Sequence, residues 1–180
     1  MIERFETERL TFRPVTLDDV DLLHDLNADP EVMHLINGGQ PTPREDVVEV
    51  VTASIGNRWL ATETATGRPV GWFVLKPDES QPGERELGYR LWRWAWGQGY
   101  ATEGARALIA HAFTRLDVCR IWAETMAVNT ASRRVMERSG LRYVRTFHLE
   151  WDDPLPGTEH GEVEYEILRH DWEGGSPASG

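Results

Sequence analysis

The sequence predicts one domain of the α/β class, in which strands and helices share a core. Three observations predict this class. Short segments of alternating apolar and polar residues are interspersed with segments whose apolar residues recur at helical spacing. A glycine-rich turn at residues 96–99 joins one strand-like segment directly to a long helical pattern. The length of 180 residues suits a single domain with a sizeable core.

The first third of the chain is predicted to form one strand and three helices. The strand is Leu10–Pro14, where apolar and polar residues alternate. Thr16 begins the first helix, because acidic residues follow it in the first turn. Pro30 begins the second, since proline is favoured at the first helical position. Thr42–Glu45 reads as a capping box, which predicts a third helix to about residue 55.

The rest of the chain alternates between strands and helices. The predicted strands are Arg58–Glu63, Val70–Lys76, Glu84–Leu91, Arg120–Thr125, Leu141–Trp151 and Glu162–Leu168. The predicted helices are Tyr100–Leu116 and Asn129–Ser139, the second followed by Gly140 at a favoured C-terminal position. We expect one domain over residues 1–172, and a flexible tail over residues 173–180.

Composition argues against several classes of protein. A formal charge of −11 repels nucleic acid phosphates and attracts cationic substrates such as amines. No stretch of eighteen apolar residues is present and the first residues do not resemble a signal peptide, so we expect no membrane association. The single cysteine, Cys119, excludes an internal disulfide and fits a cytoplasmic location. The six histidines lack metal-ligand spacing, so we expect no metal.

The segment Trp96–Glu103 is the strongest candidate for a phosphate-binding loop. Two glycines precede a helix, whose first backbone N–H groups and positive dipole end suit a phosphate or pyrophosphate. A Walker loop is excluded because the chain contains no Gly-Lys pair. A Rossmann fingerprint is also excluded, since Thr102 stands where its third glycine belongs.

Two sequence blocks resemble the GNAT family of N-acetyltransferases. Trp96–Ala101 is similar to the acetyl-CoA signature Q/R-x-x-G-x-G/A, with Trp96 in the place of Gln or Arg. A tryptophan before Gly-x-Gly-Tyr-Ala-Thr-Glu resembles the branch of ribosomal-protein N-terminal acetyltransferases (RimJ/RimL-like). Asn129–Leu141 is similar to the pattern Asn-x-x-Ser, helix, Gly-Phe, with Leu141 in place of Phe. The resemblance covers roughly residues 8–170.

This resemblance implies a particular fold and a particular cofactor site. It implies a mixed, twisted sheet of about seven strands, with helices on both faces and a splayed central strand pair. The splayed strands are Glu84–Leu91 and Arg120–Thr125, and the pantetheine arm of acetyl-CoA lies between them like an added strand. The implied cofactor-binding residues are Leu91, Trp92, Gly97, Gln98, Gly99, Tyr100, Ala101, Thr102, Asn129 and Ser132.

The resemblance also implies a reaction, in which an amine attacks the acetyl group directly in a ternary complex. A backbone N–H near Leu91 or Trp92 stabilises the developing oxyanion. Ser132 supplies a proton to the departing sulfur, as implied for the ribosomal-protein branch. Two carboxylates compete for the role of general base, with Glu150 ranked slightly before Glu86.

Several alternatives stay open at this point. The acceptor can be a protein N-terminus, a lysine or a small-molecule amine such as an aminoglycoside, and a non-catalytic acyl-CoA-binding regulatory domain is the main competitor. A homodimer is compatible with the resemblance. The acidic residues between 150 and 164 either bind a cationic amine or form a solvated loop. Trp92, Trp94 and Trp96 share a face if their segment is extended, and at least one is expected in the core.

Overall fold

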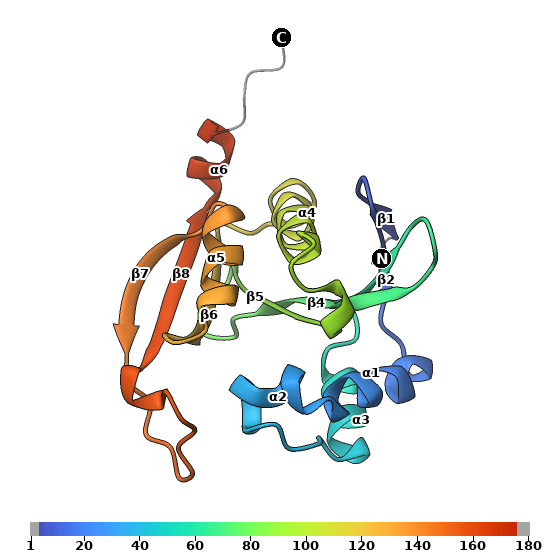
Figure 1. The fold of residues 1–180 in the computed structure, drawn as a ribbon. Coiled ribbons are helices and arrows are strands. Elements are labelled where there is room, and N and C mark those ends of the chain that lie inside the picture. The colour runs from blue at the N-terminus through green and yellow to red at the C-terminus, as the bar shows by residue number, and fades with distance from the viewer. Residues whose placement is uncertain (1–3, 176–180) are drawn as a thin grey trace.

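The protein is built around one eight-stranded sheet. A computed structural model describes residues 4–175. The strand order is β1-β2-β3-β4-β5-β6-β8-β7, and among the described strands only β5 and β6 pair in parallel (Figure 1). The strands are β1 (Phe5–Glu6), β2 (Leu10–Pro14), β3 (Arg58–Glu63), β4 (Pro69–Pro77), β5 (Glu84–Leu91), β6 (Arg120–Met126), β7 (Arg142–Phe147) and β8 (Glu162–Leu168).

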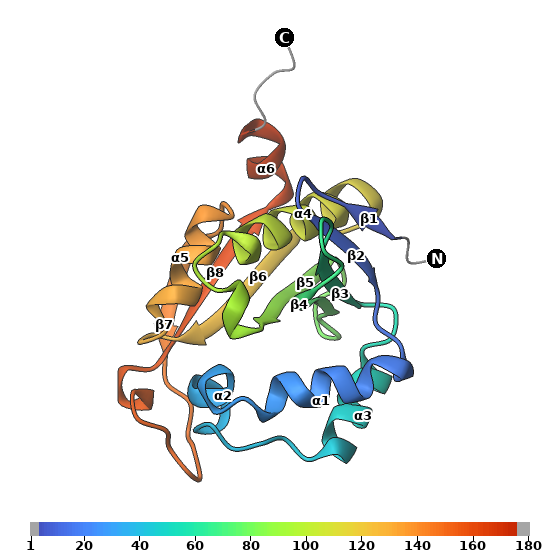
Figure 2. The ribbon, with the colours of Figure 1, turned by 45° about the vertical axis from the view of Figure 1, so that its right-hand side comes forward.

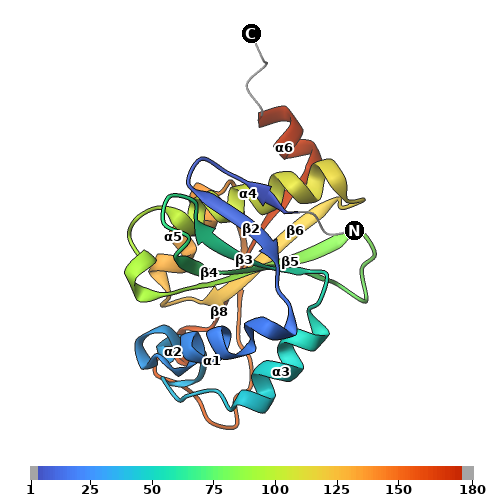
Figure 3. The ribbon, with the colours of Figure 1, turned by 90° about the vertical axis from the view of Figure 1, so that its right-hand side faces the viewer.

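Helices cover both faces of the sheet, as the sequence predicts. The helices are α1 (Val20–Ala28), α2 (Pro30–Asn37), α3 (Arg44–Ala53), α4 (Tyr100–Arg115), α5 (Thr130–Arg138) and α6 (Arg169–Gly175). Figures 2 and 3 show α1, α2 and α3 on one side of the sheet and α4 on the other. The chain therefore has the mixed α/β architecture that the sequence predicts.

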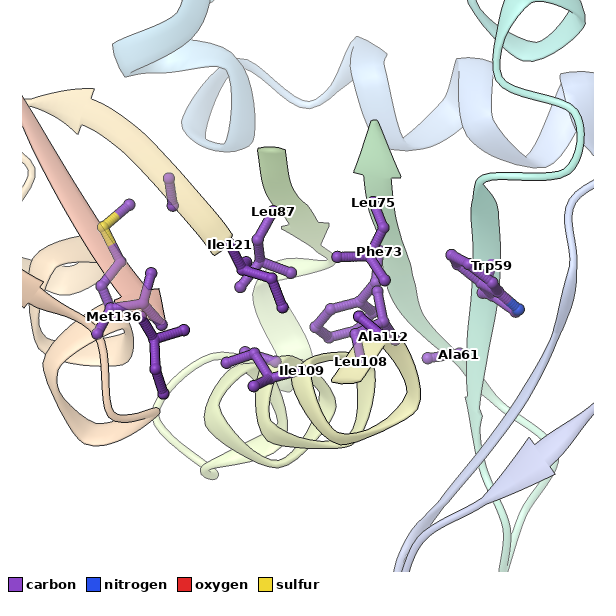
Figure 4. Packing of buried hydrophobic residues seen from close by; sticks show 14 of the residues in the cluster. Trp59, Ala61, Phe73, Leu75, Leu87, Leu108, Ile109, Ala112, Ile121 and Met136 are labelled. Carbon is purple, nitrogen blue, oxygen red and sulfur yellow. The ribbon is translucent and has the colours of Figure 1, made fainter. Parts of the chain in front are cut away.

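A large core lies between the sheet and helices α4 and α5. The buried residues of α4 recur at helical spacing, so that one face of the helix packs on the sheet. Figure 4 shows Leu108, Ile109 and Ala112 of α4 beside Phe73 of β4 and Ile121 of β6. A smaller core under β3 holds α1 and α3; its buried members are Val15, Val20, Leu23, Val47, Val51 and Leu60.

The one parallel strand pair parts soon after it forms. Strands β5 and β6 pair at three positions only, from Glu84 opposite Arg120 to Glu86 opposite Trp122. Helix α4 connects them, because parallel neighbours need a crossover connection. Beyond Glu86, β5 continues beside β4 to Leu91, while β6 continues beside β8 to Met126. The two strands thus separate in the middle of the sheet, as expected for a splayed pair.

The structure corrects several predicted boundaries. An eighth strand, β1, was not predicted because two residues are too few to show alternation. The predicted capping box at Thr42–Glu45 is wrong: the residue that caps α3 is Pro43, which has no side-chain acceptor. The first three residues of the predicted tail, residues 173–175, belong to α6. The rest of that tail, residues 176–180, lies outside the described residues.

The tryptophan segment before the glycines is a turn, so the extended conformation that a shared face requires is not present. Residues Arg93–Ala95 form a single 3₁₀ turn, which breaks the alternation of an extended strand. Trp94 packs against the large core and Trp92 against the smaller one, as expected for at least one of the three. Trp96 remains 47% exposed.

Gly104 on α4 tests the tight packing of this helix on the sheet. A Cβ atom at Gly104 would lie 2.3 Å from the ring of Phe73. Alanine in a helix normally stabilises by about 1 kcal/mol relative to glycine. Overpacking of a core instead costs about 1–3 kcal/mol, so we expect Gly104→Ala to lower the free energy of unfolding. Urea denaturation measures the effect.

The matched control is Gly174→Ala in α6, where nothing lies within 4 Å of the new methyl group. With no clash to oppose it, this control should leave the free energy of unfolding unchanged or raise it by up to about 1 kcal/mol. Equal stability of Gly104→Ala and wild type would contradict the described packing of Phe73 against α4.

Candidate active site

The glycine loop lies directly between β5 and α4. Gly97 and Gly99 have φ angles of +70° and +83°, a region that favours glycine. Gly99 precedes the first residue of α4, and no side chain caps this helix end. The first intrahelical bond runs from the Glu103 N–H to the Gly99 oxygen over 3.0 Å. The preceding N–H groups of α4 therefore have no partner within the helix and suit an anion.

An arginine from the N-terminal part of the chain holds this loop. The Arg9 guanidinium donates to the Gln98 carbonyl over 3.0 Å and to the Glu103 carboxylate over 2.7 Å. Thr7 donates to the same carboxylate over 2.6 Å. Although burial raises the pKa of Glu103, these hydrogen bonds hold it below its ordinary value. Sequence reasoning missed the contact between Arg9 and Glu103, because the two residues lie 94 positions apart in the chain.

The end of β5 presents one backbone N–H to the space between the parted strands. The Trp92 N–H donates to the Val70 oxygen over 3.0 Å, so Trp92 is not the free donor that the sequence suggests. Backbone groups of successive residues alternate between the two sides of a strand, so the Leu91 N–H points away from β4. The Leu91 oxygen accepts a hydrogen bond from the Trp96 indole over 2.9 Å. Leu91 is thus the remaining candidate donor.

The N-terminus of α5 is tied to both parted strands. Asn129 caps α5 by accepting from the Ser132 N–H over 3.1 Å, and it donates to Thr125 of β6 over 3.0 Å. The hydroxyl groups of Ser132 and Tyr89 of β5 lie 3.0 Å apart. Burial raises the pKa of Tyr89 to about 12, and the bond to Ser132 opposes this shift. Tyr89 was missed by sequence reasoning, although alternation places it on the same side of β5 as Leu91.

The two candidate bases lie in different settings. Strand β7 ends at Phe147, so Glu150 is exposed in the following loop and not on a strand as predicted. Glu86 lies on β5 at the last position paired with β6, where its side chain is 30% exposed and 3.6 Å from the Lys76 ammonium.

Further carboxylates gather on the face opposite α4 and α5. Glu162 of β8 is 7% exposed, and its Oε1 atom has no hydrogen-bond partner among the described residues. Burial raises the pKa of Glu162. The pKa of Glu124 on β6 is raised by burial and then by the charges of Glu86, Glu162 and Glu164. Sequence reasoning noted the acidic residues around 162 but did not place them beside Glu86.

Comparison with known proteins decides the family. The acetyltransferase (GNAT) domain matches residues 9–142 of the chain. The chain belongs to the GNAT acetyltransferases. A relative from Aspergillus fumigatus, named FsC-acetyl coenzyme A-N(2)-transacetylase, is 36% identical over 179 residues, which cover 92% of this chain and 76% of that protein. The chain is thus an N-acetyltransferase whose acetyl donor is acetyl-CoA.

Solved structures agree with the fold. A GNAT acetyltransferase from Bacillus anthracis has a TM-score of 0.78 and 26% identity, covering 93% of this chain and 99% of its own. A ribosomal L7/L12 α-N-protein acetyltransferase, solved with coenzyme A, has a TM-score of 0.77 at 20% identity, covering 92% and 98%. The second likeness is one of fold alone, so the ribosomal-protein branch stays a prediction.

The sequence leads us to expect no membrane association and no metal, and the structure bears on both expectations only for residues 4–175. Within residues 4–175, no helix is both long and apolar enough to cross a membrane. The same residues contain no group of three or more side chains that could hold a metal ion.

The buried Glu162 gives a pH-dependent prediction for stability. Because the folded pKa of Glu162 is raised, the folded protein holds a proton that the unfolded chain releases. The free energy of unfolding therefore falls as pH rises from the ordinary glutamate pKa through the raised folded value. Glu162→Gln removes this loss, so its Tm should exceed that of wild type at pH 8 and approach it at pH 4. Thermal unfolding at several pH values measures the difference.

A second glutamate on the same strand supplies the control. Glu166 pairs with the Arg120 guanidinium at 2.6 Å, so Glu166→Gln should lower Tm at pH 8. A lower Tm for Glu162→Gln at pH 8 would show that the Glu162 carboxylate has a stabilising partner, against the described contacts.

Proposed function

We propose that the chain transfers an acetyl group from acetyl-CoA to a primary amine of a small cationic molecule. The observation that carries the proposal is the position of the Ser132 hydroxyl, bound to Tyr89 of β5 while Asn129 links α5 to β6. A proton donor is thereby fixed at the point where the two strands part. The mechanism is direct attack by the amine in a ternary complex.

The residues around the parted strands fit acetyl-CoA. The N–H groups at the start of α4 suit the pyrophosphate. They belong to the segment that the sequence singled out, which consists of Gly97, Gln98, Gly99, Tyr100, Ala101 and Thr102. A side chain at Gly97 would meet no neighbouring atom, so the approach to this loop is open. Unpaired backbone groups at the end of β5 suit the amides of the pantetheine arm.

Protein groups can carry the steps that surround acetyl transfer. Bound acetyl-CoA supplies an activated acetyl thioester. The Leu91 N–H can donate a hydrogen bond to an oxygen that gains negative charge. The Ser132 hydroxyl can give its proton to the departing thiolate if it takes the second proton of the attacking amine, so that the hydroxyl is restored. Tyr89 stays protonated at neutral pH and holds Ser132 in place, because its pKa is about 12.

A carboxylate must take the proton of the attacking ammonium, and two candidates remain. Glu86 lies on β5 at the last position paired with β6, where the strands begin to part. Glu150 lies in an exposed loop, so its approach to the parted strands requires movement of that loop. We rank Glu86 before Glu150, which reverses the order expected from sequence.

The relative from Aspergillus fumigatus supports a small-molecule acceptor. Its name describes transfer from acetyl coenzyme A to an N(2) position, and the identity of 36% extends over nearly the whole of this chain. A ribosomal-protein acceptor has weaker support, because that solved structure shares only 20% identity with this chain.

The test is a thiol-release assay with acetyl-CoA and amines of several classes, including N-terminal peptides, lysine peptides, polyamines and aminoglycosides. Ser132→Ala should lower kcat by about 10²-fold, the lower range of general acid–base catalysis, with little change in the KM for acetyl-CoA. Glu86→Gln should lower kcat for the preferred amine more than Glu150→Gln does. Ser80→Ala, in the loop between β4 and β5, is the matched control and should behave as wild type.

Three outcomes would contradict the proposal. Tight CoA binding without turnover of any amine would support a regulatory acyl-CoA-binding domain. Full activity of Ser132→Ala would remove the hydroxyl from the reaction. Turnover of N-terminal peptides alone would move the acceptor to the ribosomal-protein class.

A further inference from the structure

Three glutamates from adjacent strands share the face of the sheet opposite α4 and α5. They are Glu86 of β5, Glu124 of β6 and Glu162 of β8, here called the acidic face. The register places Glu86 opposite Trp122, two residues before Glu124. It also places Met126, two residues after Glu124, opposite Glu162. Because alternate residues of a strand point to the same face, Glu124 lies between the other two.

Neighbouring carboxylates on this face are already paired with arginine, but those of Glu124 and Glu162 are not. Arg120 binds Glu84, Glu164 and Glu166 at 2.5–2.6 Å, and Arg145 binds Glu164 at 2.8 Å. Among the described residues, neither Glu124 nor Glu162 has an ion-pair partner. The Glu162 side chain is buried with one oxygen lacking a hydrogen bond. Only Glu86 has a cation, Lys76, at 3.6 Å.

An unpaired buried carboxylate is costly, and so are like charges close together. Burial and neighbouring carboxylates raise the pKa of Glu124, which Arg145 opposes, and burial alone raises the pKa of Glu162. Groups arranged at such a cost are typical of functional sites. A cationic ligand would compensate Glu124 and Glu162, which lie beside the Glu86–Lys76 pair.

The loop after β7 and the end of α2 lie on this same side of the sheet, as Figures 1 and 2 show. They touch each other, since Leu155 of the loop lies 3.1 Å from the position of a Cβ atom at Gly38. The loop and α2 therefore lie on the same side of the sheet as the acidic face, which is the side away from α4 and α5.

We propose that the acidic face binds an acceptor that carries at least two amino groups. The inference rests on the proposed function and names the class of its acceptor. The reacting ammonium must give one proton to a carboxylate, which leaves a neutral amine and a carboxylic acid. That step neutralises one member of the acidic face. The remaining carboxylates require a second ammonium group that stays charged while the first is acetylated.

The test measures binding rather than turnover, so that it is independent of the reaction. The probes are 1,4-diaminobutane and 1-aminobutane, which have the same chain length and differ by one amino group. Isothermal titration calorimetry measures the Kd of each probe for the CoA-bound protein at neutral pH. The variants are Glu162→Gln and Glu124→Gln. Glu49→Gln, on the exposed side of α3, makes the same change in net charge and is the matched control.

We expect the diamine to bind at least about tenfold more tightly than the monoamine, which corresponds to one compensated charge. Each acidic-face variant should weaken diamine binding by about tenfold and leave the monoamine within about twofold, while Glu49→Gln changes neither. Glu124 is exposed, so its variant tests the proposal even where Glu162→Gln alters the fold.

Equal affinity for the two probes, or equal losses for both in the variants, would overturn the proposal. Failure of CoA itself to bind would instead contradict the proposed function. Tight diamine binding without acetylation would keep the acidic face as a diamine site and reject the catalytic role.

Discussion

The separation of β5 from β6 is the constraint on which the rest of this structure depends. The two strands pair at three positions, and then each follows its other neighbour. Strand β5 ends at Leu91, and only a short turn and the glycine loop separate it from the start of the crossover helix α4 at Tyr100. A helix end that suits a phosphate and free strand edges are thus produced together by one β-α-β connection.

Two polar networks keep this arrangement in position. Arg9 joins the N-terminal part of the chain to both the glycine loop and Glu103 of α4. Tyr89 and Asn129 connect β5 and β6 to the start of α5, so the helix bridges the gap that the strands leave. The acidic face lies on the opposite side of the same strands, where the unpaired Glu162 is expected to oppose stability. We interpret this as a cost retained for binding.

The sequence predicted most of what depends on local pattern. Seven of the eight strands and the glycine turn could be read from alternation and glycine positions, and the predicted helix begins at Asn129, the residue that caps α5. The contacts that complete the site could not be predicted, because Arg9 with Gln98 and Tyr89 with Ser132 are distant in the chain. Glu150 was placed on a strand that ends three residues earlier, since alternation alone does not show where pairing stops.

The most direct test of this account is hydrogen–deuterium exchange of the protein with and without CoA. We predict that CoA slows exchange in two segments, residues 87–103 around the end of β5 and residues 125–133 at the start of α5. The β3–β4 hairpin, residues 58–77, should exchange at the same rate in both states. Unchanged exchange in residues 87–103, with protection elsewhere in the chain, would contradict the assignment of the parted strands and glycine loop as the cofactor site.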